Sequence, residues 1–161
     1  WPRRGASTGT GAALVLHQQR IPATPFCPGF VAQRALADAA VDAAGAATPL
    51  AELVNTPLVA LAGIARPEVF FDMLTERGLT LAQRWPLPDH ADLGALWPDL
   101  LAQCPPGATV LCTDKDAVKL WPLLDASSPR VLAVPLVLTP EPDFFAALDA
   151  QLSSGHGPQT P

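Results

Sequence analysis

The stretch PLVALAGIARPEVFFDMLTERG, residues 57–78, joins an apolar segment directly to a segment with helical periodicity. Residues 57–64 form a continuous apolar run of strand length, which is typical of a parallel strand covered on both faces. Pro67 suits the first turn of a helix and Gly78 suits its end, so we expect a helix over 66–78. A buried strand that passes directly into a helix is the repeating unit of α/β proteins.

The same alternation continues downstream of this unit. Strands are expected over 79–87, 108–113 and 130–138, and helices over 91–104, 115–124 and 141–152. Pro98 should interrupt its helix, and Pro135 should place its strand at a sheet edge. The order predicts a layered α/β domain with a mainly parallel sheet.

The upstream part has a different composition. Residues 12–17 suit a short strand, and three prolines make 20–30 irregular. Helix-forming residues over 31–45, followed by Gly45 at the end, predict a helix. The expected organisation is a Pro/Gly-rich lead-in over 1–30, an α/β lobe over 31–152 and a disordered tail over 153–161.

The amino-acid composition of the chain argues against several classes of protein and of binding site. Fifteen acidic against ten basic residues give a net charge of −5, which argues against a dedicated nucleic-acid binder. Three cysteines without a C-x-x-C pair favour neither a zinc site nor a disulfide framework, and we expect no metal ligand. No stretch is long and apolar enough for a transmembrane helix. The chain begins without Met or a signal-peptide pattern, so we expect a piece of a longer protein.

Ligands of open α/β sheets bind beyond the carboxyl ends of the strands. Three expected loops lie there: 62–67, 88–92 and 113–117. The last loop, TDKDA, has two interpretations. Thr113 and Asp116 have the spacing of a helix cap, which the spacing alone favours. Alternatively, Lys115 and the helix N-terminus face an anionic ligand, and the two interpretations are compatible.

His90 is the one histidine expected to follow a strand end. Asp89 and Asp92 flank it, and a carboxylate beside an imidazole suits general acid–base catalysis. The alternative is an ordinary loop histidine. The glycine-rich segment GASTGTG, residues 5–11, is not a P-loop, because no Gly-Lys pair occurs in these 161 residues.

Three stretches in series, ALAGIARPEVFFDMLTERGL, WPLPDHADL and VLCTDKDAVKL, resemble the C-terminal part of the tetraacyldisaccharide 4'-kinase family. These are the lipid A 4'-kinases of Gram-negative bacteria. The resemblance covers about residues 57–152, and the motifs are specific only as a series. Asp114 stands where the family usually has Glu.

The resemblance implies the second lobe of a two-lobed P-loop kinase, which transfers the ATP γ-phosphate to the 4'-hydroxyl of tetraacyldisaccharide 1-phosphate. It implies ATP and Mg²⁺, held mainly by the N-terminal lobe, and a peripheral location at the cytoplasmic face of the inner membrane through that same lobe. His90 and Asp89 would be catalytic, with His90 helping to deprotonate the hydroxyl together with an Asp of the other lobe. The residues expected to face the cleft are Thr113, Lys115, Asp116 and Lys119.

Two alternatives to the kinase remain at this point. One is a non-catalytic α/β binding module that keeps the fold of the lobe. The other is an unrelated α/β enzyme that uses Cys112 or His90. A reactive Cys112 thiol would favour the second alternative, whereas a buried and inert thiol would count against it.

Overall fold

The computed structural model describes residues 14–17 and 29–154, which form two compact units. One unit contains the described residues up to Arg34 and from Leu138 onward, and the other is Ala35–Val137. The predicted boundaries at residues 30 and 152 stay a prediction, because they concern the lobes of a longer protein, whereas this division reflects packing within the chain.

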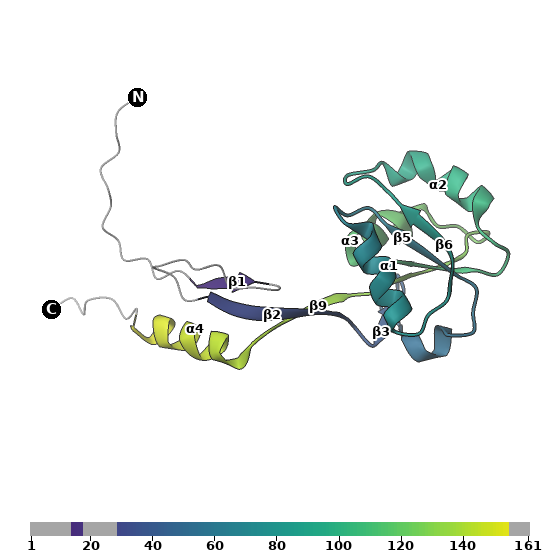
Figure 1. The fold of residues 1–161 in the computed structure, drawn as a ribbon. Coiled ribbons are helices and arrows are strands. Elements are labelled where there is room, and N and C mark those ends of the chain that lie inside the picture. Colours follow the sequence, from purple (N-terminus) through teal and green to yellow (C-terminus); the bar gives the residue numbers. More distant parts are fainter. Residues whose placement is uncertain (1–13, 18–28, 155–161) are drawn as a thin grey trace, which may run out of the picture. The chain divides into compact units, whose positions relative to one another are not determined.

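The larger unit is built on a six-stranded sheet with the order β4-β3-β8-β7-β5-β6. Strands β5 and β6 lie side by side in it (Figure 1). Its strands are β3 (Ala39–Val41), β4 (Ala47–Pro49), β5 (Leu58–Ala62), β6 (Leu81–Pro86), β7 (Thr109–Cys112) and β8 (Arg130–Ala133). The pairs β5–β6, β5–β7 and β7–β8 are parallel, whereas β3 pairs antiparallel with β4 and β8. The predicted α/β fold with a mainly parallel sheet is confirmed.

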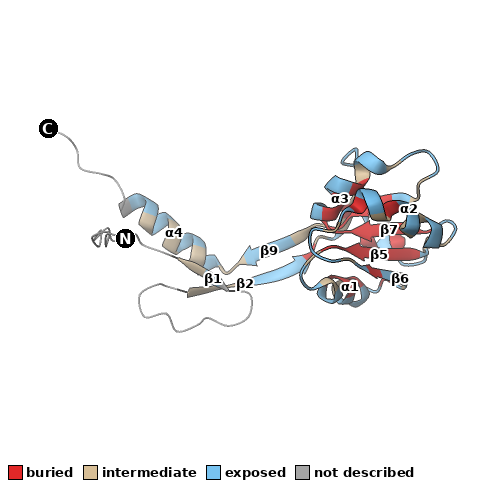
Figure 2. Ribbon diagram, turned by 90° about the horizontal axis from the view of Figure 1, so that it is seen from above, coloured by how far each residue is buried: buried red, intermediate tan, exposed pale blue. Residues whose placement is uncertain are grey.

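Helices connect the parallel strands and cover both faces of the sheet (Figure 2). They are α1 (Pro67–Glu76), α2 (Leu93–Gln103) and α3 (Asp114–Leu120), with short 3₁₀ helices η1 (Leu50–Leu53) and η2 (Trp121–Leu123). Pro67 occupies the first turn of α1, and Gly78 follows the helix at a φ of 81°. Both residues act as predicted, since proline lacks the N–H that a helix start leaves free and glycine tolerates positive φ.

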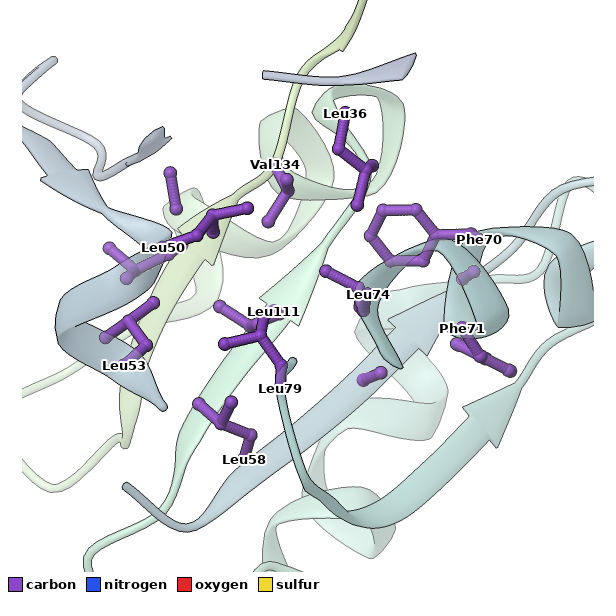
Figure 3. Packing of buried hydrophobic residues seen from close by; sticks show 14 residues of the cluster. Leu36, Leu50, Leu53, Leu58, Phe70, Phe71, Leu74, Leu79, Leu111 and Val134 are labelled. Carbon is purple, nitrogen blue, oxygen red and sulfur yellow. The ribbon is translucent and has the colours of Figure 1, made fainter. Parts of the chain in front are cut away.

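Strand β5 divides the core into two layers because its side chains alternate between the sheet faces. Leu58, Ala60 and Ala62 pack in the layer with α1, where Phe70, Phe71 and Leu74 are fully buried (Figure 3). Val59 and Leu61 pack in the layer with α2 and α3. Every residue of β5 is buried, as expected for a strand covered on both faces.

The smaller unit contains a three-stranded sheet with the order β1-β2-β9 and a terminal helix. Its elements are β1 (Val15–His17), β2 (Gly29–Leu36), β9 (Leu136–Pro140) and α4 (Pro142–Ser154). Glu141, just before α4, is joined to β2 by two hydrogen bonds. Its carboxylate accepts the Val31 N–H at 2.8 Å, and its own N–H donates to the Val31 carbonyl at 2.9 Å. Phe30 packs edge-on against Phe144, with ring centroids 5.6 Å apart.

The helix predicted over 31–45 is wrong. This segment forms most of β2, all of β3 and a turn in which the Asp42 carboxylate accepts the N–H groups of Ala44 and Ala46, each at 2.9 Å. Gly45 occupies that turn with a φ of 82°. Alanine-rich composition reports an intrinsic helix preference of a few tenths of a kcal/mol per residue, which strand pairing and burial readily override.

Two proline predictions also differ from the structure. Helix α2 runs continuously through Pro98. The strand predicted over 130–138 is divided into β8 and β9, with Pro135 between them. Strand β8 pairs on both sides, whereas β9 lies at the edge of the three-stranded sheet, so the predicted edge position holds for β9 and is wrong for β8. The Pro135 carbonyl instead accepts the Ala37 N–H at 2.9 Å. Of the irregular segment predicted over 20–30, residues 18–28 lie outside the described residues, and Gly29 begins β2.

None of the helices within residues 29–154 combines the length and the apolar character that crossing a bilayer requires.

Leu111→Ala should destabilise the protein strongly, because Leu111 is fully buried in the central strand β7. We expect the free energy of unfolding to fall by about 3 kcal/mol, through lost apolar contact and a residual cavity. Urea denaturation measures this change. Val118→Ala, at a side chain that is 66% exposed on α3, is the matched control and should change stability by less than about 0.5 kcal/mol. Equal effects of both substitutions would contradict the packing described here.

Candidate functional site

The three loops predicted from the sequence converge at one edge of the six-stranded sheet. They follow β5, β6 and β7, which are neighbours in the order β7-β5-β6. Hydrogen bonds join them directly: the Leu87 N–H donates to the Ala62 carbonyl at 2.9 Å, and the Gly63 N–H donates to the Asp116 carboxylate at 2.9 Å. The carboxyl edge of the sheet is therefore the candidate site.

Thr113 and Asp116 form a buried network at the start of α3. The Thr113 hydroxyl caps the helix by accepting the Asp116 N–H at 3.4 Å, and it donates to the Asp116 carboxylate at 2.7 Å. The same carboxylate oxygen accepts the Gly63 N–H. The two residues are only 4% and 2% exposed, so their polar groups are used inside the protein. The predicted cap is present, and their contact with a nucleotide stays a prediction.

Gly63 is required by this network. A Cβ at this position would lie 2.9 Å from Oδ1 of Asp116, which is closer than carbon and oxygen approach without a bond. A buried carboxylate is costly unless its oxygens are hydrogen-bonded, and the Gly63 N–H supplies one of those bonds. The sequence near Gly63 does not indicate this contact, because Asp116 lies 53 residues further along the chain.

Lys115 links the other two loops. Its ammonium donates a hydrogen bond to the carboxylate of Asp89, in the loop after β6, and a longer one of 3.4 Å to the carbonyl of Gly63, in the loop after β5. The side chains of Lys115 and Asp89 are 43% and 45% exposed, so the ion pair stands in partial contact with solvent. Asp89 and Lys115, both predicted site residues, are thus brought together.

His90 sits at the tip of the same loop with its side chain 83% exposed. Its backbone has a φ of 63°, a conformation that non-glycine residues seldom adopt, and its N–H donates to the Asp89 carboxylate at 3.1 Å. Nε2 of the imidazole lies 3.6 Å from the other carboxylate oxygen of Asp89. An exposed imidazole beside a carboxylate is able to accept a proton from a ligand and to hold the resulting charge.

The hydrogen bond from Lys115 lowers the pKa of Asp89, and the nearby His90 and the Lys115 charge act in the same direction. A carboxyl group whose pKa is lowered on folding stabilises the folded state above its unfolded pKa, and this contribution disappears as the pH falls through the folded value. Asp89 therefore stays ionised, as a partner of Lys115 and His90, throughout the neutral range.

The sequence model of the family described as tetraacyldisaccharide-1-P 4'-kinase, LpxK, matches residues 10–153. The chain belongs to this family.

Curated relatives agree with this assignment. A tetraacyldisaccharide 4'-kinase of Polaromonas naphthalenivorans is 50% identical over 167 residues, which cover 99% of this chain and 46% of the relative. One from Verminephrobacter eiseniae is 50% identical and covers 94% of this chain and 32% of the relative. The chain thus spans about half, or less, of the length of these relatives.

A solved structure resembles the fold. The "apo" form of LpxK from Aquifex aeolicus, crystallised in complex with ATP, superposes with a TM-score of 0.59 at 18% sequence identity. The match covers 84% of this chain and 39% of that one. The likeness supports the α/β fold of this part of the kinase family.

Three other charged residues of the same motifs, Lys119, Asp92 and Asp114, have different neighbours from Asp89 and Lys115. Lys119, predicted to face the cleft, is exposed one turn beyond Lys115, and no hydrogen bond or ion pair joins it to residues 14–17 or 29–154. Asp92 caps α2 by accepting the Ala95 N–H at 3.3 Å, so Asp89 alone of the two flanking acids contacts His90. Asp114, which replaces the usual Glu, lies exposed in the first turn of α3.

The described residues offer neither a cluster of three metal ligands nor a reactive thiol at this site. Within the described ranges, no group of three or more His, Cys, Asp or Glu side chains is placed to hold a metal ion. Cys112 is fully buried in β7 with its thiol 3.6 Å from the Leu132 carbonyl. Burial raises the pKa of this thiol strongly, and the charges of Asp116 and Asp114 add to the rise. The thiolate needed for nucleophilic catalysis is therefore strongly disfavoured.

A pocket of about 520 Å³ lies at the opposite, amino-terminal edge of the sheet, where Thr109 and Arg130 begin their strands. None of the predicted site residues lines this pocket.

Gly63→Ala should lower the free energy of unfolding by about 1–3 kcal/mol, because the new methyl group displaces the buried Asp116 carboxylate. Thermal or urea denaturation measures the change. Gly94→Ala is the control: its methyl group would lie 3.3 Å from the exposed Oδ1 of Asp92, which caps α2, while alanine is a better helix former than glycine. These two effects oppose each other, so the free energy of unfolding should change by less than about 1 kcal/mol. A neutral Gly63→Ala would contradict the close approach.

Cys112 should resist thiol reagents in the folded protein. In a variant with Cys27→Ser and Cys104→Ser, Cys112 is the remaining thiol, and burial should slow its modification by 5,5'-dithiobis(2-nitrobenzoate) roughly 100-fold relative to the denatured chain. Absorbance of the released thionitrobenzoate measures the rate. Rapid labelling before denaturation would revive the alternative of an enzyme that uses this cysteine.

Proposed function

We propose that this chain is the C-terminal lobe of a kinase that transfers the γ-phosphate of ATP to the 4'-hydroxyl of tetraacyldisaccharide 1-phosphate. Family membership over residues 10–153 and the names of relatives that are 50% identical support this proposal. The complex of the Aquifex aeolicus protein with ATP supports ATP as the phosphate donor. The chain by itself should be inactive, because it spans only about half the length of those relatives.

The observation that carries the mechanism is the placement of His90. It lies exposed at the carboxyl edge of the sheet, beside an ionised Asp89. In the proposed step, the imidazole accepts the proton of the 4'-hydroxyl while that oxygen forms a bond to the γ-phosphorus and the bond to ADP breaks. Asp89 then stabilises the imidazolium. An Asp of the N-terminal lobe, implied by the family resemblance, completes the base.

Phosphoryl transfer also needs cations at the phosphates, and Mg²⁺ supplies such charge when it is bound with ATP. No group of three or more His, Cys, Asp or Glu side chains lies together among the described residues, and we assign no step to a metal held by this chain. We place the P-loop lysine, the magnesium carboxylates and most lipid contacts in the N-terminal lobe. The 161 residues contain no Gly-Lys pair of a P-loop.

We also propose a peripheral location at the cytoplasmic face of the bacterial inner membrane, reached through the N-terminal lobe. The proposed acceptor is a membrane lipid and the donor is cytosolic ATP, which supports this placement. Alkaline carbonate should release the full-length protein from membranes without detergent. Retention until detergent is added would contradict a peripheral location.

His90→Asn in the full-length protein should lower kcat by roughly 10²-fold or more, the usual effect of losing a general base. Asparagine tolerates the positive φ of position 90 better than alanine, so this variant removes the imidazole while it keeps the loop. Transfer of labelled phosphate from ATP to the lipid A disaccharide precursor measures the activity, and an unchanged thermal midpoint confirms folding.

Two results would contradict the proposal in different ways. Wild-type turnover by His90→Asn would remove His90 from the mechanism. No transfer by the full-length wild-type protein would favour the non-catalytic α/β binding module instead.

A further inference from the structure

We propose that Lys115 is a positioning residue for His90, and not a ligand of the substrate phosphates. Its ammonium connects Asp89 to the loop after β5 and thereby holds the loop that carries His90. This inference rests on the proposed function, in which His90 is the base, and it adds a role for the lysine of the Thr-x-Lys-Asp motif.

Lys115 lies in the first turn of α3, and the neighbouring residue Asp116 holds the start of this helix in place. Asp116, the next residue, is buried and accepts hydrogen bonds from the Thr113 hydroxyl and the Gly63 N–H, at 2.7 and 2.9 Å. These bonds fix the start of α3 against the loop after β5. The Gly63 carbonyl is then 3.4 Å from the Lys115 ammonium, so the same glycine is held through both of its backbone polar groups.

The other contact of the ammonium is with the histidine loop. Lys115 donates to Oδ1 of Asp89, and this oxygen also accepts the N–H of His90 at 3.1 Å. The Asp89 carboxylate offsets the charge of the ammonium, which leaves Lys115 less available to an incoming phosphate. Lys119, by contrast, has no such partner among the described residues, although it shares the helix.

The loop needs such an anchor. His90 adopts a φ of 63° and its side chain is 83% exposed, so most of the imidazole surface faces solvent. Its recorded bonds are both to Asp89, and Asp89 is itself bonded to Lys115. Loss of the ammonium therefore frees the carboxylate that orients His90. A displacement of about 1 Å at a reacting group costs as much as 10²-fold in rate.

The test is a double-mutant cycle in the full-length kinase with Lys115→Met, His90→Asn and the combined variant. Methionine keeps an unbranched apolar stem and removes the ammonium. We expect Lys115→Met to lower kcat by about 10- to 100-fold with the KM values for ATP and lipid changed less than about twofold. In the His90→Asn background the same substitution should change kcat less than about twofold, because its effect acts through the imidazole.

Two further variants sharpen the result. Lys115→Arg keeps the cation and should recover part of the lost kcat. Arg130→Met removes one positive charge at the opposite edge of the sheet and should keep the wild-type kcat, which controls for net charge. Thermal midpoints of all variants within a few degrees of the wild type exclude unfolding as the cause.

The outcomes separate the two proposals. A raised KM for ATP or lipid with unchanged kcat would make Lys115 a substrate ligand and overturn the inference. An equal kcat loss from Lys115→Met with and without His90 would also overturn it, while the role of His90 would stand. An unchanged kcat in His90→Asn itself would overturn both the proposed base and its positioning residue.

Discussion

The carboxylate of Asp116 is the constraint on which the candidate site depends. It is an almost fully buried acid, and such a group persists in a fold only when hydrogen-bond donors surround it. Its donors come from two different connections of the sheet: the Thr113 hydroxyl at the start of α3 and the Gly63 N–H after β5. One side chain therefore fixes the distance between two loops, and the third loop is joined to them through Lys115.

Local sequence predicted the parallel part of the sheet because each of its elements carries its own signal. The apolar run of β5, Pro67 and Gly78 around α1, and the cap of α3 all depend on residues close to one another along the chain. The segment 31–45 has no such signal. It forms strands because β3 pairs with β4 and with β8, which lies about 90 residues downstream, and composition carries no information about that partner.

For the candidate site, the sequence likewise predicted which residues lie there but not the contacts between them. The rule that ligands bind at strand ends located Asp89, His90, Thr113 and Lys115, and the structure brings their loops together. The contacts between loops were not predictable, because Gly63 and Asp116 are 53 residues apart and Asp89 and Lys115 are 26 apart. The spacing of Thr113 and Asp116 indicated a cap, yet gave no sign that the same carboxylate also accepts a backbone N–H from the loop after β5.

The half-exposed ion pair between Lys115 and Asp89 has a further consequence. Counterions screen such a pair, whereas the buried bonds of Asp116 are shielded from salt. The hold of Lys115 on the histidine loop should therefore weaken as the ionic strength rises, whereas the bonds that fix the start of α3 to the loop after β5 should keep their strength.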